Sequence, residues 1–379
     1  MEDLLPRIDA GEGLLVLDVR NDEEFKDWRL EGRRPVETLH IPYFQFIEDL
    51  DGSMARVPRE REVVVLCAQG GSSAMVVEML RETGIPARNV RGGMVAYGEY
   101  LQPARVGLRA DEAGRFEIWQ LNRRGKGCLS YVIRSRDEAV VVDAARRVER
   151  YEAFVRSLGA RIVRVFETHI QADHVSGGPS LAARAGVPYF VSAGSGFELR
   201  QRIEPLGDGR DIRLGGDGGG GLVVRIIETP GHTPGSTSYL VGERYLLTGD
   251  TIFVTSVGRP DLGGHVVEWG RALFQTLSRL QSLPDETVLL PAHYANAREI
   301  GPDGVVSGRW AELRQSIPEL RIETEAEFLA AMRRSLKAPP ASYGEIIRVN
   351  LGHANPTEEK VTEWELGKNQ CAVAAKAAH

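Results

Sequence analysis

The chain has 379 residues, 42% of them hydrophobic, and a formal net charge of −6 at pH 7. This length allows two or three domains with cores of their own, and the acidic balance argues against nucleic acid or an anionic membrane as partner. The sequence shows no membrane-length apolar run, its acidic start lacks a signal-peptide pattern, and its three cysteines indicate no disulfide framework. We therefore expect a cytoplasmic protein with small-molecule partners, and the composition leaves a homodimer open.

The first hundred residues predict a separate α/β unit built around one cysteine. The apolar strands Leu14–Arg20 and Val63–Leu66 lie in it, and the second runs directly into Cys67. Glycines and serines separate this cysteine from a helix, so backbone N–H groups would face its sulfur and favour a thiolate or a persulfide anion. These loop residues are Gly70, Gly71, Ser72 and Ser73. The alternative is that Cys67 is only a small buried apolar residue, and the glycines argue against it.

This stretch resembles the rhodanese sulfurtransferases in its LDVRNDEEF segment, its Cys67 loop and its Val90–Tyr97 segment. The resemblance implies a rhodanese-like domain over residues 1–101, with Cys67 as its catalytic sulfur carrier. Many single-domain rhodaneses close this loop with an arginine, where the chain has Ser72. A small thiol persulfide is therefore a better expected donor than thiosulfate, and an inactive domain is the alternative.

Histidines and aspartates follow several predicted strands of the second unit, each beside Gly or Pro. The first group follows the strand Ile162–Phe166, and the others lie in the segments TPGHTPGS, TGDT and PAHY. The candidate metal ligands are His169, Gln171, Asp173, His174, His232, Asp250 and His293. One histidine alone would be a structural residue, but imidazoles and carboxylates gathered at strand ends predict a metal site.

The order of these segments is similar to that of the metallo-β-lactamase superfamily, which implies a four-layer αβ/βα sandwich over residues 116–334. The GKGCLSY and GRPD segments are most similar to those of persulfide dioxygenases. That resemblance implies one Fe(II) per chain on His169, His232 and Asp250, a two-histidine, one-carboxylate triad with open positions. The other four candidates would orient ligands or remain from a second metal position.

Two residues are candidate substrate contacts. Arg259 can grip a carboxylate of a glutathione-like persulfide through two hydrogen bonds, or it can form an ion pair with Asp261. Tyr294, beside the last histidine, is the second candidate. The basic pairs Arg123-Arg124 and Arg146-Arg147 predict solvated faces instead of binding patches.

The polar residues 102–115 predict a linker, and residues 335–379 predict an extension that packs on the metal domain, as in similar fusions. The expected activity is oxidation of a thiol persulfide by O2 to sulfite, coupled to sulfur transfer through Cys67. Two alternatives stay open. A thioester hydrolase of the glyoxalase II kind would take zinc at two positions, which Gln171 disfavours. A sulfur carrier or sensor would use the metal domain only as structure.

Overall fold

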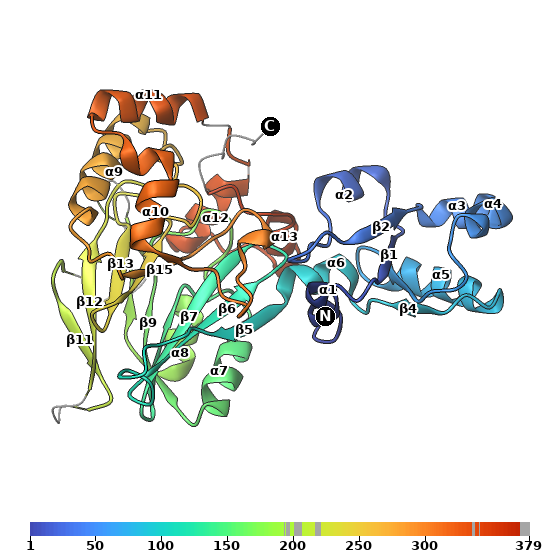
Figure 1. Ribbon diagram of the computed structural model, residues 1–379, viewed down its shortest axis with the longest axis horizontal. Coiled ribbons are helices and arrows are strands. Elements are labelled where there is room, and N and C mark those ends of the chain that lie inside the picture. The colour runs from blue at the N-terminus through green and yellow to red at the C-terminus, as the bar shows by residue number, and fades with distance from the viewer. Residues whose placement is uncertain are drawn as a thin grey trace.

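The computed structural model describes residues 1–192, 194, 198–200, 207–216, 221–335, 338–340 and 342–371. Within these ranges the chain forms a four-stranded sheet followed by two six-stranded sheets (Figure 1). The expected fold class, a rhodanese-like α/β unit followed by an αβ/βα sandwich, is confirmed. The glycine-rich sequence at 215–221 predicts a loop between strands, and part of it, like the last eight residues, lies outside the described residues.

The N-terminal unit is a parallel sheet in the order β2-β1-β3-β4 with helices on both faces. Its strands are β1 (Leu15–Asp18), β2 (Glu37–His40), β3 (Val63–Leu66) and β4 (Ala87–Asn89). Its helices are α1 (Leu4–Ala10), α2 (Asp22–Asp27), α3 (Tyr43–Glu48), α4 (Leu50–Ala55), α5 (Gly71–Glu82) and α6 (Gly93–Glu99). Side chains alternate along β1 and β3, so one face packs on α3, α4 and α5 and the other on α1 and α6. Burial on both faces explains why these strands are continuously apolar.

The second unit contains two sheets that face each other. The first has the order β10-β9-β8-β7-β6-β5 and the second β11-β12-β13-β14-β15-β16. Strands of the first are β5 (Leu101–Arg105), β6 (Glu117–Arg123), β7 (Cys128–Ser135), β8 (Glu138–Val142), β9 (Arg161–Phe166) and β10 (Tyr189–Phe190). Strands of the second are β11 (Asp211–Leu214), β12 (Leu222–Glu228), β13 (Thr237–Val241), β14 (Tyr245–Gly249), β15 (Val288–Pro291) and β16 (Gly308–Arg309). One large apolar cluster joins their inner faces and forms the core.

Helices cover the outer faces of both sheets and complete four layers. α7 (Val148–Ser157) and α8 (Gly178–Ala185) pack on the first sheet through a second apolar cluster. α9 (Val266–Leu280), α10 (Trp310–Ser316) and α11 (Glu325–Ser335) pack on the second sheet. Two short 3-10 helices, η1 (Ala297–Glu299) and η2 (Pro318–Arg321), lie in connections. None of the helices in the described ranges is long and apolar enough to cross a bilayer.

The linker predicted over residues 102–115 is shorter than expected. Leu101–Arg105 is strand β5, which pairs antiparallel with β6 from Leu101↔Arg123 to Arg105↔Trp119. The polar sequence was misleading because β5 lies at the edge of the sheet, where half-exposed polar side chains are common. The chain therefore enters the sandwich directly from α6.

Arginines hold the two units together, so the prediction of solvated faces was wrong for Arg123, Arg124 and Arg146. Arg124, 1% exposed, binds Asp9 of α1 at 2.7 Å. The Arg146 guanidinium lies 2.8 Å from Glu99 of α6, and Arg123 donates to Gly98 O at 2.6 Å and to Glu365 at 2.7 Å. Each charge is compensated by a group from a distant segment, a pairing that local sequence does not reveal.

The C-terminal extension packs on the metal domain near the junction of the two units (Figure 1). It contains α12 (Ser342–Asn350) and α13 (Glu358–Trp364) and continues to the buried Cys371. Tyr343 and Cys371 form an apolar cluster with Ala172 and Phe253 of the sandwich. The extension therefore reaches the turn that carries the first predicted metal ligands.

Candidate metal centre and cysteine loop

Three buried donor atoms from three strand ends meet at one point. His169 follows β9, His232 follows β12, and Asp250 follows β14. Asp250 Oδ2 lies 3.6 Å from His169 Nε2 and 3.5 Å from His232 Nε2. These three atoms are buried and none has a hydrogen-bond partner in the described part of the chain. Buried polar atoms are normally paired, so three unpaired donor atoms that converge on one point fit a bound metal ion.

Each of the two histidines is held by a hydrogen bond at its Nδ1 atom, the ring nitrogen that faces away from the common point. His232 Nδ1 lies 2.9 Å from Arg259 O; a carbonyl only accepts, so Nδ1 carries the proton. The Thr168 hydroxyl donates to Asp143 at 2.9 Å and therefore accepts from His169 Nδ1, also at 2.9 Å. In both rings Nε2 is left with a free lone pair that faces the common point. This is the arrangement that orients metal-bound histidines.

Both histidines are neutral, as metal ligands must be. Burial lowers the pKa of His169 to about 3, against an opposing effect of Asp250. Burial likewise lowers the pKa of His232. Burial would raise the pKa of Asp250, but His293 and His169 outweigh it and hold the carboxylate ionised. Two neutral imidazoles and one carboxylate fit a single divalent transition metal such as Fe(II) or Zn(II).

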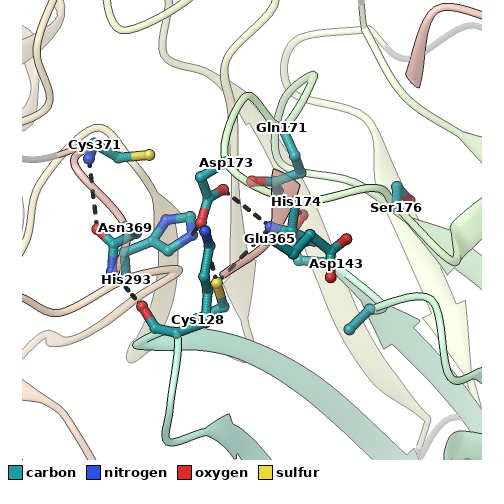
Figure 2. A network of polar contacts seen from close by, with 12 residues as sticks. Cys128, Asp143, Gln171, Asp173, His174, Ser176, His293, Glu365, Asn369 and Cys371 are labelled. Carbon is teal, nitrogen blue, oxygen red and sulfur yellow. Dashed lines mark hydrogen bonds and ion pairs between the residues drawn. The ribbon is translucent and has the colours of Figure 1, made fainter. Parts of the chain in front are cut away.

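The second metal position has some of its donor groups bonded to one another (Figure 2), while Nε2 of His174 and Nε2 of His293 have no hydrogen-bond partner among the described residues. Asp173 accepts from Cys128 Sγ at 3.2 Å and contacts His174 Nδ1 at 3.0 Å. His293 Nδ1 lies 2.6 Å from Asp250 Oδ1, and its Nε2 lies 3.2 Å from Asp173 Oδ2 without a well-aligned hydrogen bond. Burial would lower the pKa of His293, but Asp173 and Asp250 outweigh it and raise that pKa. Asp250 thus gives one oxygen to His293 and keeps the other free.

Gln171 turns its amide toward a buried carboxylate. Its Nε2 donates to Asp143 Oδ1 at 3.1 Å, and its Oε1 has no partner among the described residues. Asp143 has a left-handed backbone with φ 56 and also accepts from Thr168 N at 2.7 Å. Burial raises the pKa of Asp143 to about 6. This aspartate therefore holds both the His169 ring, through Thr168, and the Gln171 side chain.

Three residues near this centre were missed by the sequence analysis. Asp143 directly follows the strand Val140-Val141-Val142. The rule that polar residues after apolar strands mark the site, which found the candidate metal ligands, would therefore have found Asp143 as well. Cys128 joins Asp173, His174 and His293 in one group of potential ligands, and Cys371 joins Asp250 and His293 in another. Cys128 lies in the GKGCLSY segment, but no metal-ligand spacing surrounds either cysteine, because only the fold brings them to the site.

The two predicted substrate contacts are engaged elsewhere. Arg259 binds Asp261 through two hydrogen bonds of 2.6 and 2.7 Å and is 3% exposed, so of the two readings the ion pair is the one observed. The Arg259 guanidinium is thus paired with Asp261, and its contact with a substrate carboxylate stays a prediction. Tyr294 is 1% exposed and its hydroxyl donates to Asn122 at 3.0 Å. Its ring lies 5.3 Å from Lys368 Nζ, so Tyr294 is a packed residue and not an open contact.

The Cys67 loop is a cradle of hydrogen-bond donors. Gly70 N and Ser73 Oγ each lie 3.0 Å from Cys67 Sγ, at the start of α5, and Ser73 Oγ also lies 2.7 Å from Asn89 Oδ1, so its one proton serves two acceptors. Gly70 has φ 97, and a Cβ there would lie 2.9 Å from Gly92 N, so the turn requires glycine. Burial would raise the pKa of Cys67, but hydrogen bonds from Ser73, Gly70 and Gln69 outweigh it and lower that pKa. The loop therefore stabilises an anionic sulfur.

Two family models match the chain. The metallo-beta-lactamase superfamily matches residues 123–293, and the rhodanese-like domain matches residues 1–100. A hydroxyacylglutathione hydrolase of Acidiphilium cryptum is 35% identical over 178 residues, 45% of this chain and 67% of that protein. The mitochondrial persulfide dioxygenase ETHE1 of Bos taurus is 28% identical over 233 residues, 60% of this chain and 84% of that protein.

Two solved structures similar to this chain are of the same kinds of protein. ETHE1 from Myxococcus xanthus has a TM-score of 0.53 and 26% identity, and the match covers 62% of this chain and 98% of that one. A metallo-beta-lactamase from Staphylococcus aureus subsp. aureus COL has a TM-score of 0.58 and 25% identity, covering 64% and 74%. The chain therefore belongs to the metallo-β-lactamase superfamily and carries a rhodanese-like domain before its metal domain.

Proposed function

We propose that the metal domain is a non-heme iron dioxygenase that oxidises a low-molecular-weight, glutathione-like thiol persulfide to sulfite. One observation carries this proposal: the unpaired Nε2 atoms of His169 and His232 and Oδ2 of Asp250 converge, and Gln171 turns its amide to Asp143 where the two-metal enzymes have a further histidine. Two histidines and one carboxylate are the ligand set of Fe(II) oxygenases. The relatives named persulfide dioxygenase and ETHE1 support the same assignment.

The proposed reaction balances with O2 and water as its only other reactants. A persulfide RSSH, O2 and H2O give the thiol RSH, sulfite and two protons. The outer sulfur loses four electrons, O2 gains four, and the S–S bond breaks with the inner sulfur leaving as the thiol. The bound Fe(II) would supply the redox chemistry with O2.

The chain's own residues would hold and shield this centre. His169, His232 and Asp250 would bind the iron, with their orientation set by Thr168, Arg259 O and His293. All three ligands are at most 1% exposed. Such burial excludes bulk water and strengthens the electrostatic interactions inside the site.

The rhodanese-like domain would exchange sulfur with the same pool of persulfides. The Cys67 thiolate attacks the outer sulfur of RSSH, the S–S bond breaks, and the thiolate RS⁻ leaves with the electron pair. The resulting Cys67 persulfide can pass its outer sulfur to sulfite, which gives thiosulfate and regenerates Cys67. Hydrogen bonds from Gly70 and Ser73 to the sulfur support both anionic states.

A thioester hydrolase is the second candidate. The 35% identity to a hydroxyacylglutathione hydrolase favours it, and so does the presence of Asp173, His174 and His293. Such an enzyme would need a nucleophilic hydroxide held by two metals. A carrier or sensor protein is a weaker candidate, because a purely structural metal site has a full ligand set, whereas this one has three donors.

Metal analysis and two assays test the proposal on the full chain purified without oxygen. We expect about one iron per chain, from the single triad, and O2 uptake with glutathione persulfide that yields sulfite. S-lactoylglutathione should not be cleaved. Two zinc ions per chain with thioester cleavage and no O2 uptake would establish the hydrolase instead.

Gln171 provides a separate test of the metal count. Its amide donates to Asp143, so Gln171→Ala should keep most of the iron, with at most about a tenfold loss of affinity from the altered surroundings. Gln171→His would restore the full superfamily ligand set and should raise zinc occupancy without raising the rate of O2 uptake. Metal counts and oxygen-electrode rates on wild type and both variants measure this. An iron-free Gln171→Ala protein would mean that Gln171 is itself a ligand.

A further inference from the structure

The loop that carries the first metal ligands has no regular secondary structure from residue 171 to residue 175. Backbone N–H and C=O groups in such a buried loop need partners from elsewhere in the molecule. The sandwich holds the far end of the loop, where Gly177 N donates to Ala144 O at 2.7 Å. Several of the remaining partners come from the C-terminal extension, roughly 180 positions away in sequence.

Asn350, the last residue of α12, binds the loop through three hydrogen bonds. Its Nδ2 donates to Gln171 O at 2.8 Å and to His174 O at 2.9 Å. Its Oδ1 accepts from Ser176 N at 2.9 Å. The side chain is buried, with 5% exposure. One amide group thus fixes the spacing between the beginning, the middle and the end of the loop.

Glu365, at the end of α13, binds the loop N–H that lies between His174 and Ser176. Its Oε1 accepts from Val175 N at 2.8 Å, directly after His174. Its Oε2 contacts Arg123 at 2.7 Å and Arg146 at 3.2 Å. Burial would raise the pKa of Glu365, but these two arginines outweigh it and keep the carboxylate ionised. The loop is therefore attached to a buried group of charges, Glu365 with Arg123 and Arg146, in addition to the neutral amide of Asn350.

An apolar contact completes the attachment. Ala172, 2% exposed, packs in one cluster with Tyr343 and Cys371 of the extension. In total, the loop backbone makes four hydrogen bonds to the side chains of Asn350 and Glu365, and the loop makes one apolar contact to the extension. His169 lies two residues before the first of these bonds, and Asp173 and His174 lie inside the bound segment.

We propose that Asn350 and Glu365 are positioning residues of the metal centre, through which the C-terminal extension sets the geometry of the ligand loop. Neither side chain is itself a ligand; each acts through the loop backbone. Groups that orient metal ligands contribute substantially to affinity even without touching the ion. The inference rests on the metal site alone and holds for an oxygenase and for a hydrolase.

The test measures metal affinity and metal-induced stabilisation of the full chain. Asn350→Ala removes three bonds; Asn350→Asp keeps the shape and the acceptor for Ser176 N but loses both donors. Glu365→Gln keeps the shape and loses the charge. Fe(II) and Zn(II) are each titrated into metal-free protein without oxygen, against a competing chelator, and melting temperatures are recorded with and without metal. Asn355→Ala, an exposed asparagine of the same extension, is the matched control.

We expect the Asn350 variants to bind either metal about 10- to 100-fold more weakly than wild type, with a smaller loss in Glu365→Gln. The rise in melting temperature on metal binding should shrink accordingly, since that rise depends on the dissociation constant. A merely structural role would lower the melting temperature of the metal-free form and leave the affinity unchanged, and that result would overturn the proposal. Should Asn350→Ala not fold, the two shape-preserving variants decide the question. The Asn355 control should match wild type throughout.

Discussion

His232→Ala should abolish iron binding and O2 uptake together while sulfur transfer at Cys67 persists. The substitution removes one of three donors from a site whose other two, His169 and Asp250, cannot hold a divalent ion at comparable affinity. We expect iron affinity to fall by more than about 100-fold, beyond the effect of a ligand-orienting residue. Iron content by elemental analysis and O2 uptake with glutathione persulfide measure the result. His169→Ala and Asp250→Ala should behave in the same way.

His265→Ala is the matched control, because this histidine is largely exposed and contacts Glu268 instead of the centre. It should keep the iron and the rate of O2 uptake. Asp250→Asn adds a sharper variant, since it keeps the shape and removes the charge that balances the ion. Should His232→Ala keep a full complement of iron, His232 would not be a ligand and the triad would be wrong.

The sandwich and its candidate metal ligands could be predicted because the first candidate after each strand lies one to four residues beyond the end of that strand. The apolar segments before His169, His232, Asp250 and His293 are β9, β12, β14 and β15. Strand ends on the same edge of the two facing sheets place their following residues together. An apolar strand and the polar residue that follows it are both local features, so they can be recognised from the sequence alone.

Predictions that depended on partners distant in sequence failed. Arg123 and Arg124 were expected at the surface, but Glu365 and Asp9 compensate their charges inside the protein. Arg146 was likewise expected at the surface, and Glu99 and Glu365 engage it. A charged side chain is buried only when its partner is brought to it. The identity of that partner is a property of the fold.

The C-terminal extension shows the same limit at the site itself. Asn350 and Glu365 have no neighbouring motif, yet they bind the loop between Gln171 and Ser176. Cys371 likewise lies near Asp250 and His293 because the fold brings it there, where Arg259 N donates to its carbonyl at 3.2 Å. Contacts that close a site from another part of the chain leave no period or spacing in the sequence.

Cys67→Ser should abolish sulfur transfer and leave O2 uptake with a supplied persulfide nearly unchanged. The hydroxyl that replaces the thiol cannot carry sulfane sulfur, while the metal ligands belong to the other domain. Transfer from glutathione persulfide to sulfite, measured as thiosulfate, should therefore disappear. Full transfer activity in Cys67→Ser would remove the sulfurtransferase assignment, and a parallel loss of O2 uptake would mean that the two reactions share this cysteine.

Ser73→Ala tests why Cys67 is reactive. Burial raises the pKa of this thiol, and the hydrogen bonds from Ser73, Gly70 and Gln69 bring it below its ordinary value. Alkylation requires the thiolate, so its rate rises with pH through the pKa. Loss of the Ser73 hydroxyl, 3.0 Å from the sulfur, should raise the pKa and move the alkylation profile of Cys67 to higher pH. Peptide mapping by mass spectrometry separates Cys67 from Cys128 and Cys371, and Ser72→Ala, which keeps this hydrogen bond, is the control. An unshifted profile in Ser73→Ala would assign the thiolate to the backbone donors alone.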